Sequence, residues 1–348
     1  MPAAPPPAAP GARPGFAAAL AAGPLVLDGG LSNQLADAGH DLSDALWSAR
    51  LLADAPEAVT AAHLGYFRAG AQVAITASYQ ASFEGFARRG TGRAEAERLL
   101  ALSVRLAREA ARQAESERAE AARAAARQAG RADDGRAEDG RAAPARPGAI
   151  AAGPLFVAAS VGPYGAVLAD GSEYRGRYGL GVAELERFHR PRLEVLAAAG
   201  PDVLALETVP DMVEAEALLR AVDGLGVPVW LSFSAEGGLT RAGQPLEDAL
   251  GMAAGVDAVV AVGVNCCSPA DADRAVPVAA RAAGLPVVVY PNSGEAWDAA
   301  ARDWRGGPTF RPERVTGWLA DGARLVGGCC RVGEREIAGL ARAVRGAG

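Results

Sequence analysis

Eight short apolar runs, spread between residues 24 and 330, constrain the fold of this chain more than any other feature of its sequence. Each run is rich in valine, leucine or isoleucine and is followed by a turn and a helix-like segment. The runs are PLVLDGG (24–30), QVAIT (72–76), FVAASVGP (156–163), VLALET (203–208), PVWLSFS (228–234), AVVAVGVNC (258–266), PVVVYPN (286–292) and RLVGGCC (324–330). Continuous apolar runs of this length are typical of parallel strands that are covered on both faces.

The segments between these runs are amphipathic, for example residues 184–199, 210–222, 270–283 and 312–320. Eight strands that alternate with helices predict an α/β fold, a (β/α)8 TIM barrel in a single domain. An open, doubly wound sheet is the alternative arrangement of such units. The first run is not followed by the glycine-rich turn of a nucleotide-binding sheet, so the barrel is favoured.

Two stretches fall outside this regular spacing. Residues 1–22 are rich in alanine and proline, and we expect a disordered N-terminal extension before a barrel at 23–348. Residues 93–128 are almost all Ala, Arg, Glu and Leu, a composition that favours a long helix. A low-complexity insert at about 118–148 overlaps the end of that helix, and its charged, glycine-rich part, 130–148, is expected to be a disordered surface loop.

The charge of the chain excludes some classes of partner. The formal net charge is −6, and all 35 cationic residues are arginines. Nucleic acid is not expected as a partner, because phosphate binding needs a basic face. The absence of lysine excludes Schiff-base chemistry. No apolar run reaches about 18 residues and the N-terminus has no secretion signal, so we expect a cytoplasmic protein with no membrane partner.

Polar residues gather at the carboxyl ends of the predicted strands. They are Asp28, Thr76, Glu207, Ser234, Asn265, Cys266, Tyr290, Asn292, Cys329 and Cys330. In TIM barrels the chemistry takes place at this end of the strands, where the βα loops begin. The sequence therefore predicts one site, built from side chains that are far apart along the chain.

The four cysteines form two vicinal pairs, Cys266-Cys267 and Cys329-Cys330. Zinc binds thiolates in tetrahedral geometry, and a catalytic zinc keeps one position open, so three of these cysteines could hold such an ion. Cys267 is the natural exception, because adjacent residues of a strand point to opposite faces. The spacing fits two pairs of buried free cysteines equally well.

At these residues the chain resembles the homocysteine S-methyltransferase family, from about residue 24 to residue 345. The matching fragments are LDGGLSNQLADAGHDLSDALWSARLL (27–52), ITASYQASFEGF (75–86), SVGPYGAVLADGSEYRGRYG (160–179), ALETVPDMVEAEAL (205–218), GVNCCSP (263–269), VVVYPNSGEAWD (288–298) and LVGGCCR (325–331). GVNC together with GGCC is a specific signal, whereas either one alone is weak. The stretch GPYGAVLADGSEYRG is similar to the branch of the family that uses sulfonium methyl donors.

The resemblance implies a zinc-dependent barrel that converts L-homocysteine to L-methionine, with S-methylmethionine or S-adenosylmethionine as the methyl donor. The family's zinc ligands fall on Cys266, Cys329 and Cys330. The acidic residues that hold the homocysteine ammonium group fall on Asp28 and Glu207. Thr76 and Asn265 match positions near the amino-acid substrate. No catalytic residue is expected beyond the zinc centre itself, since zinc coordination deprotonates a thiol without a general base.

Two other classes of function fit the cysteines. The first is a redox enzyme that uses vicinal thiols, which needs a cysteine of low pKa and a resolving partner. The second is a non-catalytic barrel with a structural zinc ion. Structural zinc sites are usually closed by four ligands, whereas only three cysteines converge in the predicted barrel.

Overall fold

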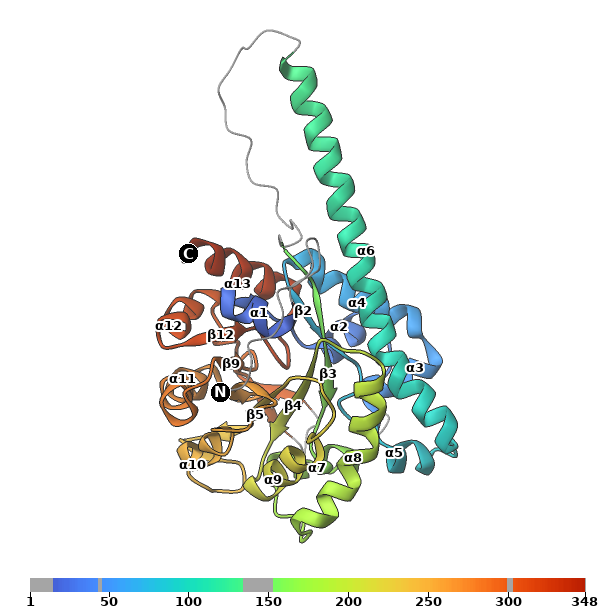
Figure 1. The fold of residues 1–348 in the computed structure, drawn as a ribbon, viewed down its shortest axis with the longest axis vertical. Helices are drawn as coiled ribbons and strands as arrows, with labels where there is room; N and C mark the ends of the chain where they lie inside the picture. The colour runs from blue at the N-terminus through green and yellow to red at the C-terminus, as the bar shows by residue number, and fades with distance from the viewer. Residues whose placement is uncertain (1–14, 43–45, 134–152, 299–302, 348) are drawn as a thin grey trace.

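The computed structural model describes residues 15–42, 46–133, 153–298 and 303–347. Eight parallel strands form one sheet (Figure 1). They are β1 (Leu25–Val26), β2 (Val73–Ile75), β3 (Phe156–Val161), β4 (Val203–Val209), β5 (Val229–Phe233), β8 (Val259–Asn265), β9 (Val287–Tyr290) and β12 (Ala323–Val326). Each of the eight apolar runs therefore contains a strand, as the sequence predicts.

The sheet closes into a barrel. Its strand order is β1-β12-β9-β8-β5-β4-β3-β2, so the first and last strands of the chain are neighbours. A parallel bridge between Leu27 and Val73 joins the two ends of this order, and the backbone N–H of Asp28 donates to the carbonyl of Val73 at 3.0 Å. The (β/α)8 barrel predicted from the sequence is confirmed.

Helices surround the strands (Figure 1). They are α1 (Phe16–Ala22), α2 (Leu31–Asp37), η1 (Trp47–Arg50), α3 (Leu51–Asp54), α4 (Pro56–Ala69), α5 (Phe83–Arg88), α6 (Arg93–Asp133), α7 (Tyr164–Leu168), η2 (Ser172–Tyr174), α8 (Val182–Ala198), α9 (Met212–Ala221), α10 (Leu246–Gly251), α11 (Pro269–Ala283), η3 (Pro312–Arg314), α12 (Val315–Ala320) and α13 (Glu334–Gly346). Two short hairpins, β6 (Ala235–Glu236) with β7 (Leu239–Thr240) and β10 (Ala296–Asp298) with β11 (Asp303–Arg305), lie outside the barrel sheet.

Local signals in the sequence set the bounds of these helices. α11 begins where the Ser268 hydroxyl accepts a hydrogen bond from the backbone N–H of Asp271, and it has Pro269 at its first position. The helix ends at Gly284, which takes the left-handed conformation that glycine adopts most readily. α9 begins in the same manner at Asp211, whose carboxylate accepts from the N–H of Val213.

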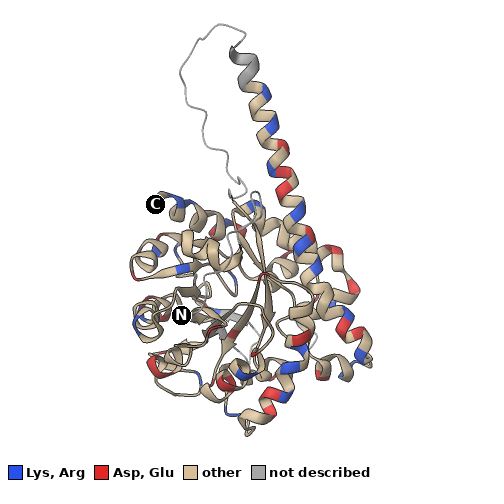
Figure 2. Cartoon of the chain, in the orientation of Figure 1, with Lys and Arg blue, Asp and Glu red and all other residues tan. Residues whose placement is uncertain are grey.

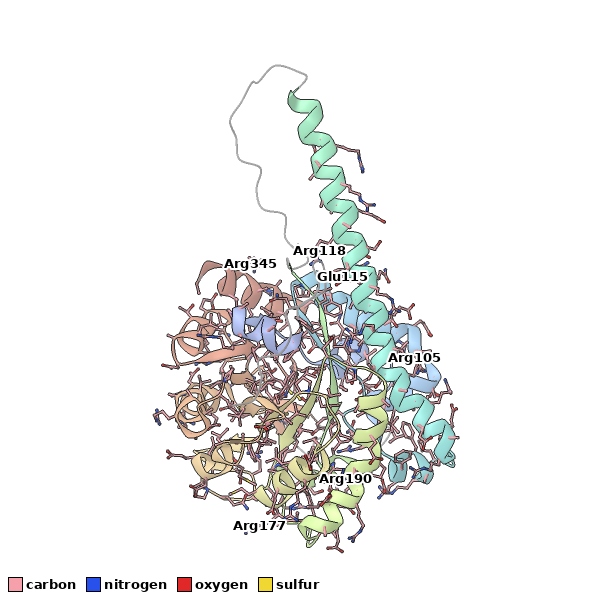
Figure 3. All side chains as sticks on the ribbon, viewed as in Figure 1. Arg105, Glu115, Arg118, Arg177, Arg190 and Arg345 are labelled. Carbon is pink, nitrogen blue, oxygen red and sulfur yellow. The ribbon has the colours of Figure 1, made fainter. Side chains whose placement is uncertain are left out.

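The long helix predicted from residue 93 is present, and it extends further than expected. α6 runs to Asp133, so the prediction of a loop is wrong for residues 130–133, which continue the helix. Residues 134–152, the rest of the expected loop, lie outside the described residues. The last part of α6 projects beyond the barrel (Figure 1) and carries charges of both signs along its length (Figure 2). Arg105, Glu115 and Arg118 mark its course in Figure 3.

The expected disorder of residues 1–22 is wrong for its last part. Residues 1–14 lie outside the described residues, but Phe16–Ala22 form the helix α1. Phe16 and Leu20 are buried and join the apolar cluster inside the barrel. The Phe16 ring packs edge-on against Phe156 at 5.4 Å between centroids. The sequence did not predict this helix, because its alanine-rich composition includes only two large apolar side chains, four residues apart, on the buried face.

The part of the chain that the structure describes contains no helix long and apolar enough to cross a membrane.

The packing of α1 predicts a measurable loss of stability. Replacing Phe16 with alanine should lower the free energy of unfolding by about 3–5 kcal/mol, the usual cost of removing a buried phenylalanine side chain. Urea unfolding followed by circular dichroism measures this loss, and Ala18→Ser on the exposed face of α1 is the control. A loss under about 1 kcal/mol, the range typical of surface changes, would mean that α1 is not part of the core.

Candidate metal centre

Three cysteine side chains meet at the carboxyl ends of β8 and β12. Cys266 follows the last residue of β8, and Cys329 and Cys330 lie just beyond the end of β12. The Cys330 sulfur is 3.7 Å from the Cys266 sulfur and 4.0 Å from the Cys329 sulfur. All three sulfurs lie within 4.8 Å of one another, in a group that could hold a metal ion. The sequence-predicted ligand set is thus brought together.

The backbone around the Cys329-Cys330 pair is tightly constrained by its neighbours. A side chain at Gly327 would place its Cβ 2.6 Å from the Cβ of Leu27, and one at Gly328 would come within 2.1 Å of Val332. Both positions therefore require glycine because other parts of the chain approach closely. The two glycines thus allow both cysteines to point to one site.

The loop after β9 positions the same pair through hydrogen bonds. The backbone N–H of Cys329 donates to the carbonyl of Pro291 at 2.8 Å, and that of Cys330 donates to the Asn292 side chain at 3.1 Å. The Ser293 N–H donates to the Cys330 carbonyl at 2.9 Å. Cys266 is held by the loop after β5, since its carbonyl accepts a hydrogen bond from the Ser234 hydroxyl at 3.2 Å.

Cys267 has a different environment. It is buried in the large apolar cluster between the sheet and the helices, and it is not part of the group of three thiols. Burial raises the pKa of its thiol. Its exclusion from the site, predicted from the alternation of side chains along a strand, is consistent with this position.

The three thiols fit a tetrahedral metal ion. With zinc–sulfur bonds of about 2.3 Å, two sulfurs of a regular tetrahedron are separated by about 3.8 Å. The two shortest separations here, 3.7 and 4.0 Å, lie close to that value. Hydrogen bonds from Cys329, from Cys330 and from the Tyr174 hydroxyl, which is 3.1 Å from the sulfur, lower the pKa of Cys266. The cluster thus stabilises a thiolate, the form that binds metals.

The two predicted carboxylates are buried; Asp28 lies just after β1 and Glu207 lies near the carboxyl end of β4. One oxygen of Asp28 accepts a hydrogen bond from the N–H of Ile75 at 2.8 Å, whereas the other is buried without a hydrogen-bond partner. Glu207 accepts from the hydroxyl groups of Ser160 and Tyr290. Burial raises the pKa of Asp28 well above its ordinary value, and the nearby Glu207 adds to this rise. Burial also raises the pKa of Glu207, to about 7.

Thr76 and Asn265 lie at the same end of the barrel, and their side chains bond to other parts of the chain. The Thr76 hydroxyl accepts from the N–H of Ser160 at 3.0 Å and is 2.7 Å from the Ser78 hydroxyl. The Asn265 side chain accepts from the N–H of Thr208 and donates to its hydroxyl, each at 2.7 Å. These bonds hold Thr208 at a positive φ of 59°, directly after Glu207.

Sequence reasoning did not single out Tyr174 and Glu173 as site residues. Both belong to η2, in the loop after β3, and the Tyr174 hydroxyl contacts Cys266. They lie within the stretch that carries the family resemblance, but an isolated tyrosine or glutamate in a loop has no characteristic spacing. Their role depends on how the loop folds back over β8, which a linear pattern does not show.

Comparison with known proteins shows which family has this sequence. A family model described as homocysteine S-methyltransferase matches residues 25–344. Homocysteine S-methyltransferase 4 from Zea mays is 42% identical over 337 residues, which cover 93% of this chain and 90% of that protein. The chain belongs to the homocysteine S-methyltransferase family.

Two further comparisons, one of sequence and one of structure, support this membership. Homocysteine S-methyltransferase from Escherichia coli is 41% identical over 321 residues, covering 91% of this chain and 94% of that protein. The crystal structure of the metallated form of the homocysteine methyltransferase MmuM from Escherichia coli is similar with a TM-score of 0.73 and 40% identity, covering 91% of this chain and 95% of the other. The family resemblance seen in the sequence is confirmed.

The buried carboxyl group of Glu207 predicts how stability of this family member depends on pH. Its pKa is about 7 in the folded chain, against an ordinary value of 4.5. A raised pKa means that the folded state binds the proton more tightly, so this group's contribution is full below about pH 4.5 and is lost as the pH rises through 7. Glu207→Gln has no such proton.

The free energy of unfolding of the metal-free protein should therefore fall relative to that of Glu207→Gln between pH 4.5 and 7. The expected change is on the order of 3 kcal/mol, from about 1.4 kcal/mol per pKa unit. Urea midpoints at several pH values measure it, with Glu247→Gln on the exposed surface of α10 as the control. Parallel curves for the wild type and Glu207→Gln would show that Glu207 is ionised at its ordinary pKa.

Proposed function

We propose that this protein uses a zinc ion to transfer a methyl group from a sulfonium donor to L-homocysteine, giving L-methionine. The observation that carries the proposal is the group of three thiols at the ends of β8 and β12, in a chain of the homocysteine S-methyltransferase family. Such a group supplies three ligands and leaves a fourth position for the substrate thiol.

Zinc suits the donor set better than the hard divalent cations. Three sulfur ligands favour a soft or borderline ion, and magnesium or calcium would require oxygen ligands. Zinc would be held by Cys266, Cys329 and Cys330, and when bound it keeps a coordinated thiol deprotonated at neutral pH. A closed structural site would need a fourth ligand, but in the described part of the chain the group contains these three alone.

The amino-acid part of homocysteine would be bound by the two buried carboxylates. Asp28 has an oxygen with no protein partner, and Glu207 lies near enough to affect its ionisation. An ammonium group between them would compensate two charges that are otherwise costly to bury. Thr76 and Asn265 would shape this part of the site, since they hold Ser160 and Thr208 next to Glu207.

The transfer itself requires positioning more than proton transfer. The homocysteine sulfur would attack the methyl carbon of the donor in line with its carbon–sulfur bond. One carbon–sulfur bond forms as the other breaks, and the sulfonium leaves as a neutral thioether. No general base takes part, because the attacking sulfur is already a thiolate. Holding both reactants converts a bimolecular reaction into an effectively unimolecular one.

A redox enzyme is the weaker alternative. It needs only one thiol of low pKa beside one resolving thiol, whereas here a third sulfur lies within 4.8 Å of the other two, as in a set of metal ligands. The proposed site needs reduced cysteines, which the cytoplasm maintains, and we propose that the protein acts there on small molecules.

The metal assignment predicts a distinction between adjacent cysteines. The purified protein should contain about one zinc per chain, the ratio for a single three-thiolate site. Serine at Cys266, Cys329 or Cys330 should remove most of the zinc and the activity, whereas Cys267→Ser should keep both. Zinc is measured by atomic emission on proteins whose circular dichroism matches that of the wild type. Loss of zinc from Cys267→Ser with retention in Cys266→Ser would contradict the assignment.

The donor is predicted from the anionic character of the proposed metal centre and from the size of each donor. S-methylmethionine should be preferred, S-adenosylmethionine should be slower because its adenosine needs additional room, and betaine should be inactive. Methionine formation from homocysteine is measured with each donor alone at matched concentration. Faster turnover with betaine than with either sulfonium would contradict the assignment to the branch that uses sulfonium donors, while leaving the metal assignment unaffected.

A further inference from the structure

The loop between β3 and α8 carries a buried carboxylate whose role the proposed chemistry has not used. Glu173, in η2, has an exposed fraction of only 6%. Its Oε2 atom is buried and has no hydrogen-bond partner, and the hydrogen bond that the carboxylate receives comes from its own backbone N–H. No ion pair to Glu173 is found in the described residues: the nearby Arg175 pairs with Asp170 at 3.9 Å and has only a minor effect on the pKa of Glu173. A buried carboxylate without a cationic partner is costly, so such a group is a candidate for binding an external cation.

The fold holds this carboxylate rigidly. Tyr164 begins the loop with its N–H donating to Glu214 at 2.6 Å, and Arg177, labelled in Figure 3, ends it with its N–H donating to Asp211 at 3.0 Å. Gly165 of α7 packs directly onto η2, where an added Cβ would lie 2.4 Å from the backbone nitrogen of Glu173. The backbone that carries Glu173 is therefore held at both ends of the loop and at η2.

Glu173 also lies close to the thiol group. The next residue, Tyr174, places its hydroxyl 3.1 Å from the Cys266 sulfur. The charges of Glu173 and Cys266 influence one another, and both influence Tyr79. The carboxylate thus belongs to the side of the site formed by η2 and Tyr79, whereas Asp28 and Glu207 belong to the ends of β1 and β4.

Charge balance separates the roles of these carboxylates. Homocysteine brings one ammonium group, which the Asp28 and Glu207 pair can bind. A sulfonium donor brings at least one further positive charge, which must be placed next to the thiol cluster before the methyl group can move. Glu173 has a buried oxygen without a hydrogen-bond partner, and the nearby tyrosines, Tyr79 and Tyr174, offer electron-rich rings that attract a sulfonium.

We propose that Glu173, together with Tyr79 and Tyr174, forms the binding site for a cationic group of the methyl donor. This inference rests on the proposed function and extends it to the second substrate. The carboxylate attracts the positive charge of the donor already in the ground state, so its loss weakens donor binding more than it slows the bound reactants.

The test compares Glu173→Gln, Glu173→Asp and the wild type. Glu173→Gln should raise the KM for S-methylmethionine about ten- to a hundredfold, the range for loss of one charge-assisted hydrogen bond. The KM for homocysteine and the zinc content should stay within about twofold of the wild type, well below a tenfold step. Glu173→Asp, which keeps the charge, should restore part of the donor affinity. Asp170→Asn is the matched control, because it removes an exposed charge from the same loop and keeps the oxygen that accepts from Ser172.

A second measurement identifies the cationic group. Trimethylsulfonium, which has the sulfonium but no ammonium group, is tested as a competitive inhibitor against S-methylmethionine. Weaker inhibition of Glu173→Gln than of the wild type places the sulfonium at Glu173, and unchanged inhibition with a raised S-methylmethionine KM places the ammonium there.

The outcomes separate this inference from the function on which it rests. A wild-type enzyme that forms no methionine with any sulfonium donor would overturn the proposed function. An active wild type whose donor KM is unchanged in Glu173→Gln would overturn the role of Glu173 alone. A variant that loses zinc or raises the homocysteine KM as strongly as the donor KM would assign Glu173 to the metal or to the first substrate, which also contradicts the inference.

Discussion

The register of β9 between its two neighbours is the constraint on which the site depends. Val289 pairs with Val264 of β8 on one side and with Val326 of β12 on the other. The three strands therefore end at the same level, and the residues that follow β8 and β12 emerge next to each other. A shift of one residue in either pairing would turn the following side chains to the opposite face. The thiol group is thus a consequence of backbone pairing at a strand that contributes no cysteine itself.

The surroundings of the thiols are unusually rich in buried acidic groups. Asp28, Glu173 and Glu207 are each at least nine-tenths buried, and burial raises the pKa of all three. In a protein without ligands these groups are destabilising, because burial of a carboxylate costs free energy unless a cation or several donors compensate it. Substrates with ammonium and sulfonium groups supply that compensation. The buried acidic groups thus lower the stability of the ligand-free protein and favour the binding of cationic amino acids. Such a loss of stability is expected at functional sites.

Much of this could be predicted from the sequence, because the relevant signals are local or repeated. The apolar runs show the strands, and the polar residue at the end of each run shows the active end of the barrel. Strand alternation predicts that Cys266 and Cys267 point to opposite faces, and the family resemblance carried by GVNC and GGCC implies that Cys266 is the ligand. Other features could not be predicted. Phe16 stabilises α1 through contacts with Phe156, and Glu173 acquires its position only when η2 packs against α7, so both depend on tertiary packing.

The most direct test of the account is the number of thiolates around the metal before and after homocysteine binds. Replacing zinc with cobalt makes this number visible, since each thiolate ligand adds to the charge-transfer absorption of the ion. An open metal centre predicts three thiolates in the protein alone and a fourth when L-homocysteine is added. When L-methionine is added instead of homocysteine, the number should stay at three, because methionine has no thiol. An absorption that homocysteine leaves unchanged, or that already corresponds to four thiolates in the free protein, would contradict an open metal centre that binds the substrate sulfur.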